Sequence, residues 1–212
     1  MEIIHGASSH LLRTAEVELA VSEQAGHLAP VSFVFASGAR FSPYALSPWL
    51  PDDLDASLPP LLRYLRGDFL CLPFGGQQAG PPHGDPANAR WELREQTAQT
   101  LSLFQLATDS GARVEKEIRL VAGQQAIYTE HRIGGLSGNW NYGNHPVLDF
   151  SSMAEGEGRV STSPWRWGSV YPGEFSNPQN GERGALLPGG RFTDLRQVPL
   201  RDGGFTLSLI HI

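Results

Sequence analysis

Two segments of the chain gather the residue types that proton transfer and hydrogen bonding to a polyol require. The first, 65–91, is rich in glycine and proline and carries six candidate side chains: Arg66, Asp68, His83, Asn88, Arg90 and Trp91. The second, 139–150, places Asn144 and His145 among aromatic and amide residues. Histidine exchanges protons near neutral pH, and both segments combine it with aromatic rings and planar polar groups. This composition favours a sugar site, in which rings cover C–H faces and planar groups bind hydroxyls.

The same residues also fit a purely structural role. Proline and glycine shape turns, tryptophan and phenylalanine fill cores, and a histidine often caps a backbone group. Other chemistries lack their motifs, because the chain has no phosphate-binding loop, no dinucleotide fingerprint, no G-x-S-x-G elbow and no H-E-x-x-H pair. Nucleotide binding through those loops and serine hydrolysis are therefore not expected.

Charge and composition exclude further classes. The 212 residues carry a formal net charge of −6, so no electrostatic footprint for nucleic acid or an anionic membrane is expected. A single cysteine, Cys71, excludes an internal disulfide framework and a cysteine zinc cluster. The opening residues lack a signal-peptide pattern and no apolar run has membrane length, which predicts a cytoplasmic protein without a membrane partner.

Alternating apolar and polar residues predict the elements that must position the two segments. Period-two runs occur at 16–21, 31–35, 100–107, 114–121 and 125–133, and turn residues between the last three predict a three-stranded meander over 100–133. Pro59 and Pro60 limit 54–64 to a short helical turn. From 151 onward, frequent glycine and proline predict loops with short strands, such as 191–198. The expected architecture is one mostly-β antiparallel sandwich domain over 1–206.

Three motifs in order resemble those of the galactose mutarotase-like superfamily, which includes aldose 1-epimerases and hexose-phosphate mutarotases. They read R-G-D-F-x-C-x-P-F-G-G from Arg66, H-G-x-x-A-N-A-R-W from His83, and N-H-P-x-x-D-F from Asn144. The resemblance extends over about 16–200. It implies an all-β fold, a large antiparallel β-sandwich (supersandwich) with a sugar cleft on a concave face. It further implies a small-molecule sugar substrate, interconversion of its α and β anomers, and no cofactor or metal.

The resemblance also implies roles for single residues. His145 matches the histidine that acts as general acid at the ring oxygen, and His83 matches one that lines the sugar site. Arg66 matches an arginine that binds sugar hydroxyls or a phosphate. Arg90 falls near a second arginine of phosphosugar members, although the insertion 85–89 argues against a phosphate preference. The remaining expected substrate-binding residues are Asp68, Asn88, Trp91 and Asn144.

The general base is the expected departure from the family. There it is a glutamate well downstream of the second histidine, near the end of the domain. The carboxylates that follow His145 stand in a different context, with Glu174 the nearest substitute. We therefore expect a chain that is incomplete at its C-terminus and lacks the base. Residues 207–212 resemble the translation of a library-adaptor sequence and are interpreted as a non-native tail, the alternative being a natural apolar strand.

Two other functions fit the same residues. One is a non-catalytic carbohydrate-binding domain on the same fold, which a downstream carboxylate would distinguish from an enzyme. The other is a metal-dependent β-sandwich isomerase with His83, His145 and a carboxylate as ligands. The sequence leaves open which sugar is bound, whether it is phosphorylated, and the oligomeric state.

Overall fold

The chain divides into two compact units, 1–152 and 153–212. The computed structural model describes residues 1–77, 80–154, 157, 161–173 and 176–206. Each unit is described below by itself. That 1–206 folds as one domain stays a prediction, and the proposed tail at 207–212 lies outside the described residues.

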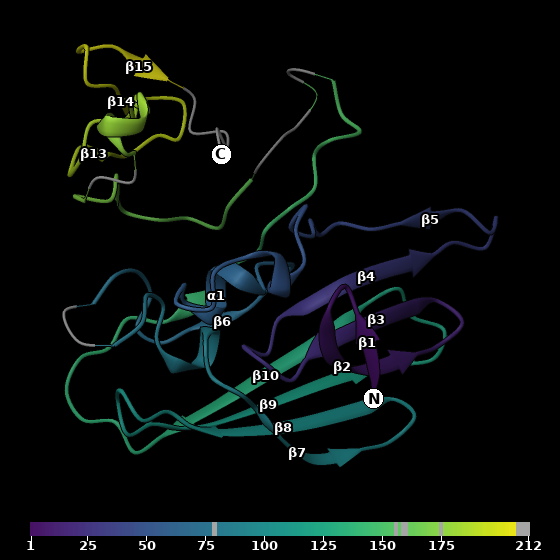
Figure 1. Ribbon diagram of the computed structural model, residues 1–212. Helices are drawn as coiled ribbons and strands as arrows, with labels where there is room; N and C mark the ends of the chain where they lie inside the picture. Colours follow the sequence, from purple (N-terminus) through teal and green to yellow (C-terminus); the bar gives the residue numbers. More distant parts are fainter. Residues whose placement is uncertain (78–79, 155–156, 158–160, 174–175, 207–212) are drawn as a thin grey trace. The chain divides into compact units, whose positions relative to one another are not determined.

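The first sheet of the first unit is an antiparallel meander of five strands (Figure 1). In order these are β1 (Glu2–Ile4), β2 (Ala7–Arg13), β3 (Val17–Ser22), β4 (Leu28–Val34) and β5 (Arg40–Phe41). Neighbours in sequence are neighbours in the sheet, as short hairpin connections favour. The strands predicted at 16–21 and 31–35 are confirmed as β3 and β4.

The second sheet has the order β10-β9-β8-β7 and is also antiparallel. It consists of β7 (Glu92–Gln96), β8 (Thr100–Leu106), β9 (Arg113–Leu120) and β10 (Ile127–Gly134), which confirms the predicted meander. Alternation along β9 buries Val114, Lys116, Ile118 and Leu120, while its intervening residues face away from the core.

The two sheets face each other across one apolar core. The first sheet contributes Leu12, Leu19 and Val31, and the second contributes Leu101 and Ile118, all almost completely buried. Each such side chain contributes about 1.5–3 kcal/mol through removal from water. Sheet-on-sheet packing through alternating residues is the defining feature of a β-sandwich, so the predicted all-β sandwich class is confirmed.

Five short elements of the first unit lie outside its two large sheets, and some of them carry the candidate site. These are the 3₁₀ turn η1 (Pro51–Asp53), α1 (Pro60–Arg63), β6 (Leu70–Cys71), η2 (Asp85–Ala87) and β11 (Gly143–Asn144). Helix α1 is four residues long and begins at a proline, which confirms the short helical turn predicted within 54–64. β6 and β11 pair antiparallel and join two parts of the chain that are far apart in sequence.

The second unit contains short pairs only. β12 (Gly168–Ser169) pairs with β13 (Arg191–Phe192), β14 (Val198–Pro199) pairs with β15 (Phe205–Thr206), and η3 covers Pro178–Asn180. The strand predicted at 191–198 is therefore found only in part, because β13 covers its first two residues and β14 begins at its last. Across the described part of both units, no helix has the length and apolar character needed to cross a membrane.

Lys116, the only lysine of the chain, lies inside the sandwich. Its ammonium group donates a hydrogen bond of 2.7 Å to the Gly26 carbonyl and lies 4.8 Å from the centre of the Trp91 ring. Burial lowers the pKa of Lys116 to about 8, and the nearby Asp68 carboxylate opposes that shift. The amine is therefore held in the core by a carbonyl and an aromatic face.

Lys116 should make stability rise with pH above about pH 8. Its pKa is about 8 in the folded chain and about 10.4 when unfolded, so the unfolded state binds more protons between these values. The full effect is about 3 kcal/mol. The free energy of unfolding of wild type and Lys116→Met, measured in urea at pH 7.5–10.5, gives this effect. Burial raises the pKa of Cys71 to about 12, which lowers stability over the same pH range. Because both proteins contain Cys71, subtracting one free energy from the other removes its contribution. An unchanged pH slope in Lys116→Met would contradict this assignment.

Candidate functional site

The fold brings His83 and His145 together. Their ring centres lie 5.2 Å apart, with the planes almost perpendicular. His145 follows β11, and its backbone N–H donates to the Phe69 carbonyl at 2.9 Å. The His83 carbonyl in turn accepts a hydrogen bond of 3.1 Å from the Leu72 N–H, immediately after β6. Both imidazoles are half-buried at the junction of β6 with β11.

The glycines that follow Arg66 and His83 in the motifs allow this close packing. Gly67 and Gly84 have φ angles of +54° and +72°. A Cβ at either position would lie 1.9 Å from a carbonyl oxygen, that of Leu28 for Gly67 and that of Leu72 for Gly84. Glycine is required at both positions because φ is positive and because another part of the main chain leaves no room for a side chain. The R-G and H-G pairs are thus explained by packing of the main chain.

His83 is held in one orientation by two hydrogen bonds to the backbone of Gly75. Its backbone N–H donates to the Gly75 carbonyl at 2.8 Å, and its Nδ1 accepts from the Gly75 N–H at 3.1 Å. With Nδ1 as acceptor, the proton of the neutral ring resides on Nε2. Burial lowers the pKa of His83, and the neighbouring His145 lowers it further. His83 is therefore a neutral imidazole with an Nε2–H donor at neutral pH.

Two phenyl rings lie beside His145, almost parallel to its imidazole. The Phe69 ring is 4.8 Å away and the Phe74 ring 5.7 Å away, each within 10° of parallel. The buried Nδ1 of His145 has no hydrogen-bond partner among the described residues. Burial lowers the pKa of His145, so its protonated form is less populated and a better proton donor than an ordinary imidazolium. These features suit a group that transfers a proton.

Arg66 lies in the interior, away from any surface where a ligand could bind. It is fully buried, and its guanidinium donates to the carbonyls of Ile4, His5 and Tyr64 at 2.9–3.1 Å. Burial lowers its pKa to about 10. In this structure Arg66 fastens the start of the chain to the segment before β6, and substrate contact would require rearrangement.

Asn88 and Trp91 also have internal partners. The Asn88 amide donates 2.8 Å bonds to the Pro82 and Gly84 carbonyls, and its oxygen accepts from the Leu61 N–H. The Trp91 indole is fully buried and donates to the Pro86 carbonyl at 3.0 Å. Both residues hydrogen-bond to the backbone near His83. Asn88 and Trp91 therefore stabilise the segment that carries His83 instead of facing a ligand.

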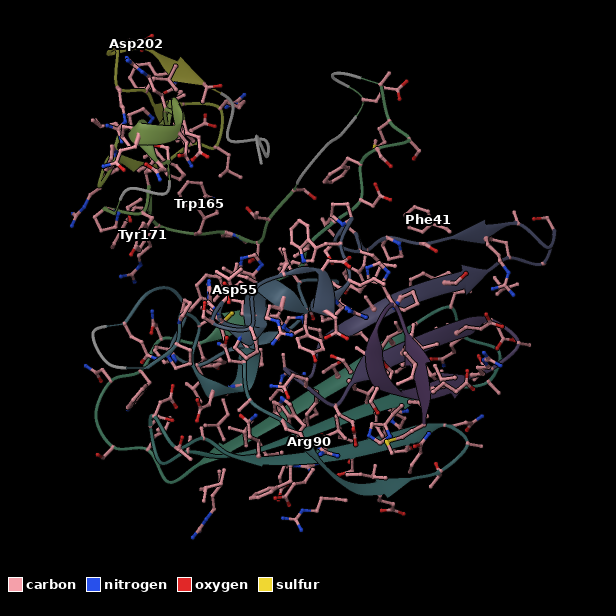
Figure 2. The ribbon with its side chains drawn as sticks, in the orientation of Figure 1. Phe41, Asp55, Arg90, Trp165, Tyr171 and Asp202 are labelled. Atoms are coloured by element: carbon pink, nitrogen blue, oxygen red, sulfur yellow. The ribbon has the colours of Figure 1, made fainter. Side chains whose placement is uncertain are left out.

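The other three expected substrate-binding residues do not join the histidines. Asp68 has a buried, unpartnered Oδ1, and burial raises its pKa while Lys116 opposes the shift. Arg90, labelled in Figure 2, is exposed and forms a 3.2 Å ion pair with Glu23. Asn144 is exposed, and alternation along the β11 strand directs it to the face opposite His145.

No carboxylate in the described part of the first unit forms a hydrogen bond or ion pair with either histidine. Glu174 lies outside the described residues. No cluster of three metal-ligating side chains occurs among the residues that the structure describes. The site is a pair of neutral imidazoles in an aromatic setting.

Sequence reasoning missed the aromatic partners of the histidines. Phe69, Phe74 and the buried His27 form a stack with His145, and His27 lies 4.4 Å from Phe69. The only available signal was that Phe69 and Phe74 fall within the first motif, where an aromatic residue reads equally well as core.

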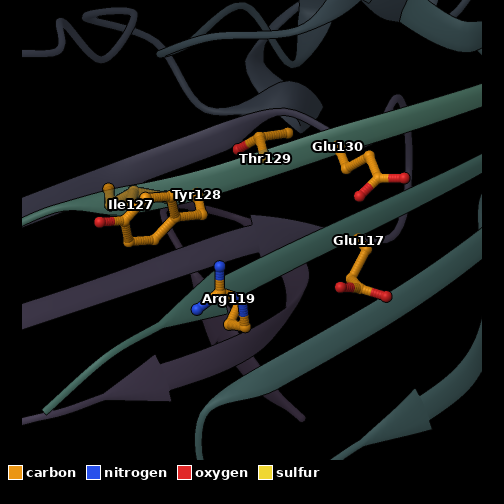
Figure 3. Close-up of a pocket in the computed structure, with 6 residues that line it drawn as sticks. All are labelled: Glu117, Arg119, Ile127, Tyr128, Thr129 and Glu130. Atoms are coloured by element: carbon orange, nitrogen blue, oxygen red, sulfur yellow. The ribbon is translucent and has the colours of Figure 1, made fainter.

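A cavity of about 450 Å³ lies elsewhere, on the outer face of β9 and β10 (Figure 3). Glu117 and Glu130 are direct cross-strand neighbours there, and the Arg119 guanidinium lies 4.6 Å from the centre of the Tyr128 ring. Neither histidine of the site lines this cavity. It is an open, charged sheet face without the acid–base arrangement of the histidine pair.

Two solved structures resemble this chain. One is a galactose mutarotase-like protein from Lactobacillus casei ATCC 334, with 12% identity, a TM-score of 0.48, and coverage of 66% of this chain and 50% of the other. The second, titled "Putative aldose 1-epimerase", is from Escherichia coli K12, with 15% identity, a TM-score of 0.46, and coverage of 79% and 54%. This chain thus spans about half the length of either. No family model and no curated protein sequence matches it.

Proposed function

We propose that this chain carries the sugar site of an aldose 1-epimerase-like protein, which interconverts the α and β anomers of an aldose. The observation that carries the proposal is the approach of His83 and His145, whose ring centres lie 5.2 Å apart. The motifs around them, resembling those of the galactose mutarotase-like superfamily, support the same assignment. The small-molecule substrate would bind at the junction of β6 with β11.

The proposed reaction opens and closes the sugar ring. A base removes the proton of the C1 hydroxyl while His145 donates a proton to the ring oxygen, the C1–O5 bond breaks, and an aldehyde forms. The aldehyde turns, and closure on its other face returns both protons. The lowered pKa of His145 makes its protonated form a strong donor, and the Nε2–H of His83 can hold a sugar oxygen.

The base is proposed to come from outside the described part of the first unit. A carboxylate on the side of C1 opposite His145 would complete the acid–base pair. The family resemblance favours a glutamate downstream of this sequence, and Glu174 is only the least unsuitable substitute within it. Without such a glutamate, the chain is expected to bind sugar weakly and turn over little.

The arginines support an unphosphorylated aldose as substrate. Arg66 is buried on backbone carbonyls, and Arg90 is paired with Glu23. Neither is free at the histidine pair to bind a phosphate.

The test is a pair of measurements on the same sugars. Polarimetry of freshly dissolved α-D-galactose and α-D-glucose measures anomer interconversion, and saturation-transfer NMR measures binding. We expect saturable binding together with interconversion, or binding alone if the base is absent. Absence of both, for the chain and for any longer natural form of it, would refute the proposal.

A non-catalytic carbohydrate-binding domain is the second candidate. The observation in its favour is that no carboxylate in the described part of 1–152 forms a hydrogen bond or ion pair with either histidine. Binding without interconversion, in protein that includes all downstream sequence, would select it over the enzyme.

A further inference from the structure

Four rings form a continuous column through the candidate site. His27 stacks on Phe69 at 4.4 Å, Phe69 stacks on His145 at 4.8 Å, and the Phe74 ring lies almost parallel to His145 at 5.7 Å. These spacings fall in the range that favours contact between aromatic rings. The inner ring, Phe69, is buried, whereas Phe74 is 40% exposed and closes the column on the solvent side.

Phe74 is itself held by the segment that carries His145. Its N–H donates to the Asn141 carbonyl at 3.3 Å, and the Asn141 side-chain amide donates to the Phe74 carbonyl at 2.8 Å. A Cβ at Gly143 would lie 3.3 Å from the Phe74 ring, so the ring rests on the bare backbone of β11. Phe74 also meets His83 edge-on at 5.1 Å. One phenyl ring therefore touches both imidazoles.

We propose that Phe74 is a positioning residue, which packs against both imidazoles and holds His145 at a fixed angle to His83, an arrangement we call the clamp. The inference rests on the proposed function for its catalytic meaning, but the clamp is a property of the chain alone. Without Phe74, His145 would be more open to water, and its ring could rotate away from His83.

The clamp has a chemical consequence. The two phenyl rings beside the imidazole exclude water and penalise its charged form, in agreement with the lowered pKa of His145. Solvent on one face would relieve that penalty. Removal of Phe74 should therefore move the titration of His145 upward toward the ordinary value of about 6.5.

NMR titration of the histidine Cε1–H signals tests the clamp on the chain as it exists, without sugar. In Phe74→Ala we expect the His145 midpoint to rise by half a pH unit or more, and in Phe74→Tyr to return to the wild-type value. Phe35→Ala is the matched control, because Phe35 is similarly exposed but takes no part in the column. It should leave His145 unchanged.

Gly143→Ala is the second variant, for the case that Phe74→Ala does not fold. Its added methyl group would displace the Phe74 ring and should raise the His145 midpoint in the same direction. If folded Phe74→Ala or Gly143→Ala titrates like wild type, the clamp is wrong. Failure of the sugar measurements with a confirmed clamp would refute the proposed function and leave this inference standing.

Discussion

Replacement of His145 by alanine is expected to lower the kcat/KM of anomer interconversion about 10²–10⁴-fold, the range typical for loss of one acid–base group. His145 lies almost parallel to both Phe69 and Phe74, and its lowered pKa makes its protonated form a better proton donor than an ordinary imidazolium. The measurement is the polarimetric rate with α-D-galactose, in protein that includes the carboxylate base.

His131→Ala is the matched control for this prediction. His131 is also half-buried, and burial lowers its pKa to about 3, but it lies on β10 outside the ring column. We expect it to retain the wild-type rate. An active His145→Ala would remove His145 from the proposed reaction, and an equal loss in both variants would indicate a general structural effect.

Replacement of Arg66 by methionine is expected to lower the free energy of unfolding by about 3–5 kcal/mol. The variant leaves the part-buried carbonyls of Ile4, His5 and Tyr64 without this donor, and each unsatisfied group costs about 1–3 kcal/mol, partly offset by an apolar side chain of similar length. Urea unfolding followed by circular dichroism measures the change.

Arg90→Met separates this structural role from a ligand role. Arg90 is exposed and forms one surface ion pair, so its loss should change stability by less than about 1 kcal/mol. The family resemblance alone would predict that both variants weaken sugar binding and leave stability similar. A stable Arg66→Met with reduced sugar affinity would therefore contradict the structural assignment.

Local sequence patterns were sufficient for the sandwich. Alternation at 100–133 predicts three antiparallel strands because a half-buried strand exposes every second side chain, and the structure has β8, β9 and β10 there. Pro59 and Pro60 limited the helical turn for an equally local reason. The motifs also singled out His83 and His145 in advance.

The surroundings of those histidines were decided only by tertiary structure. Arg66, Asn88 and Trp91 have residue types common in sugar sites, yet each is buried and satisfied by backbone groups. Whether an arginine faces solvent or backbone carbonyls depends on which distant segment packs over it, here Ile4 at the end of β1 and His5 after it. That contact cannot be predicted from residue type and spacing.

The ring column is the clearest case. Phe69 and Phe74 belong to one motif and His145 to another, and the two are joined by the pairing of β6 with β11. Two-residue strands carry no periodicity that a sequence could reveal, so neither their register nor the stack they align was predictable. The sequence identified His83 and His145 individually as candidate site residues. Their orientation, protonation and packing against aromatic rings depend on contacts between segments that are far apart in the chain.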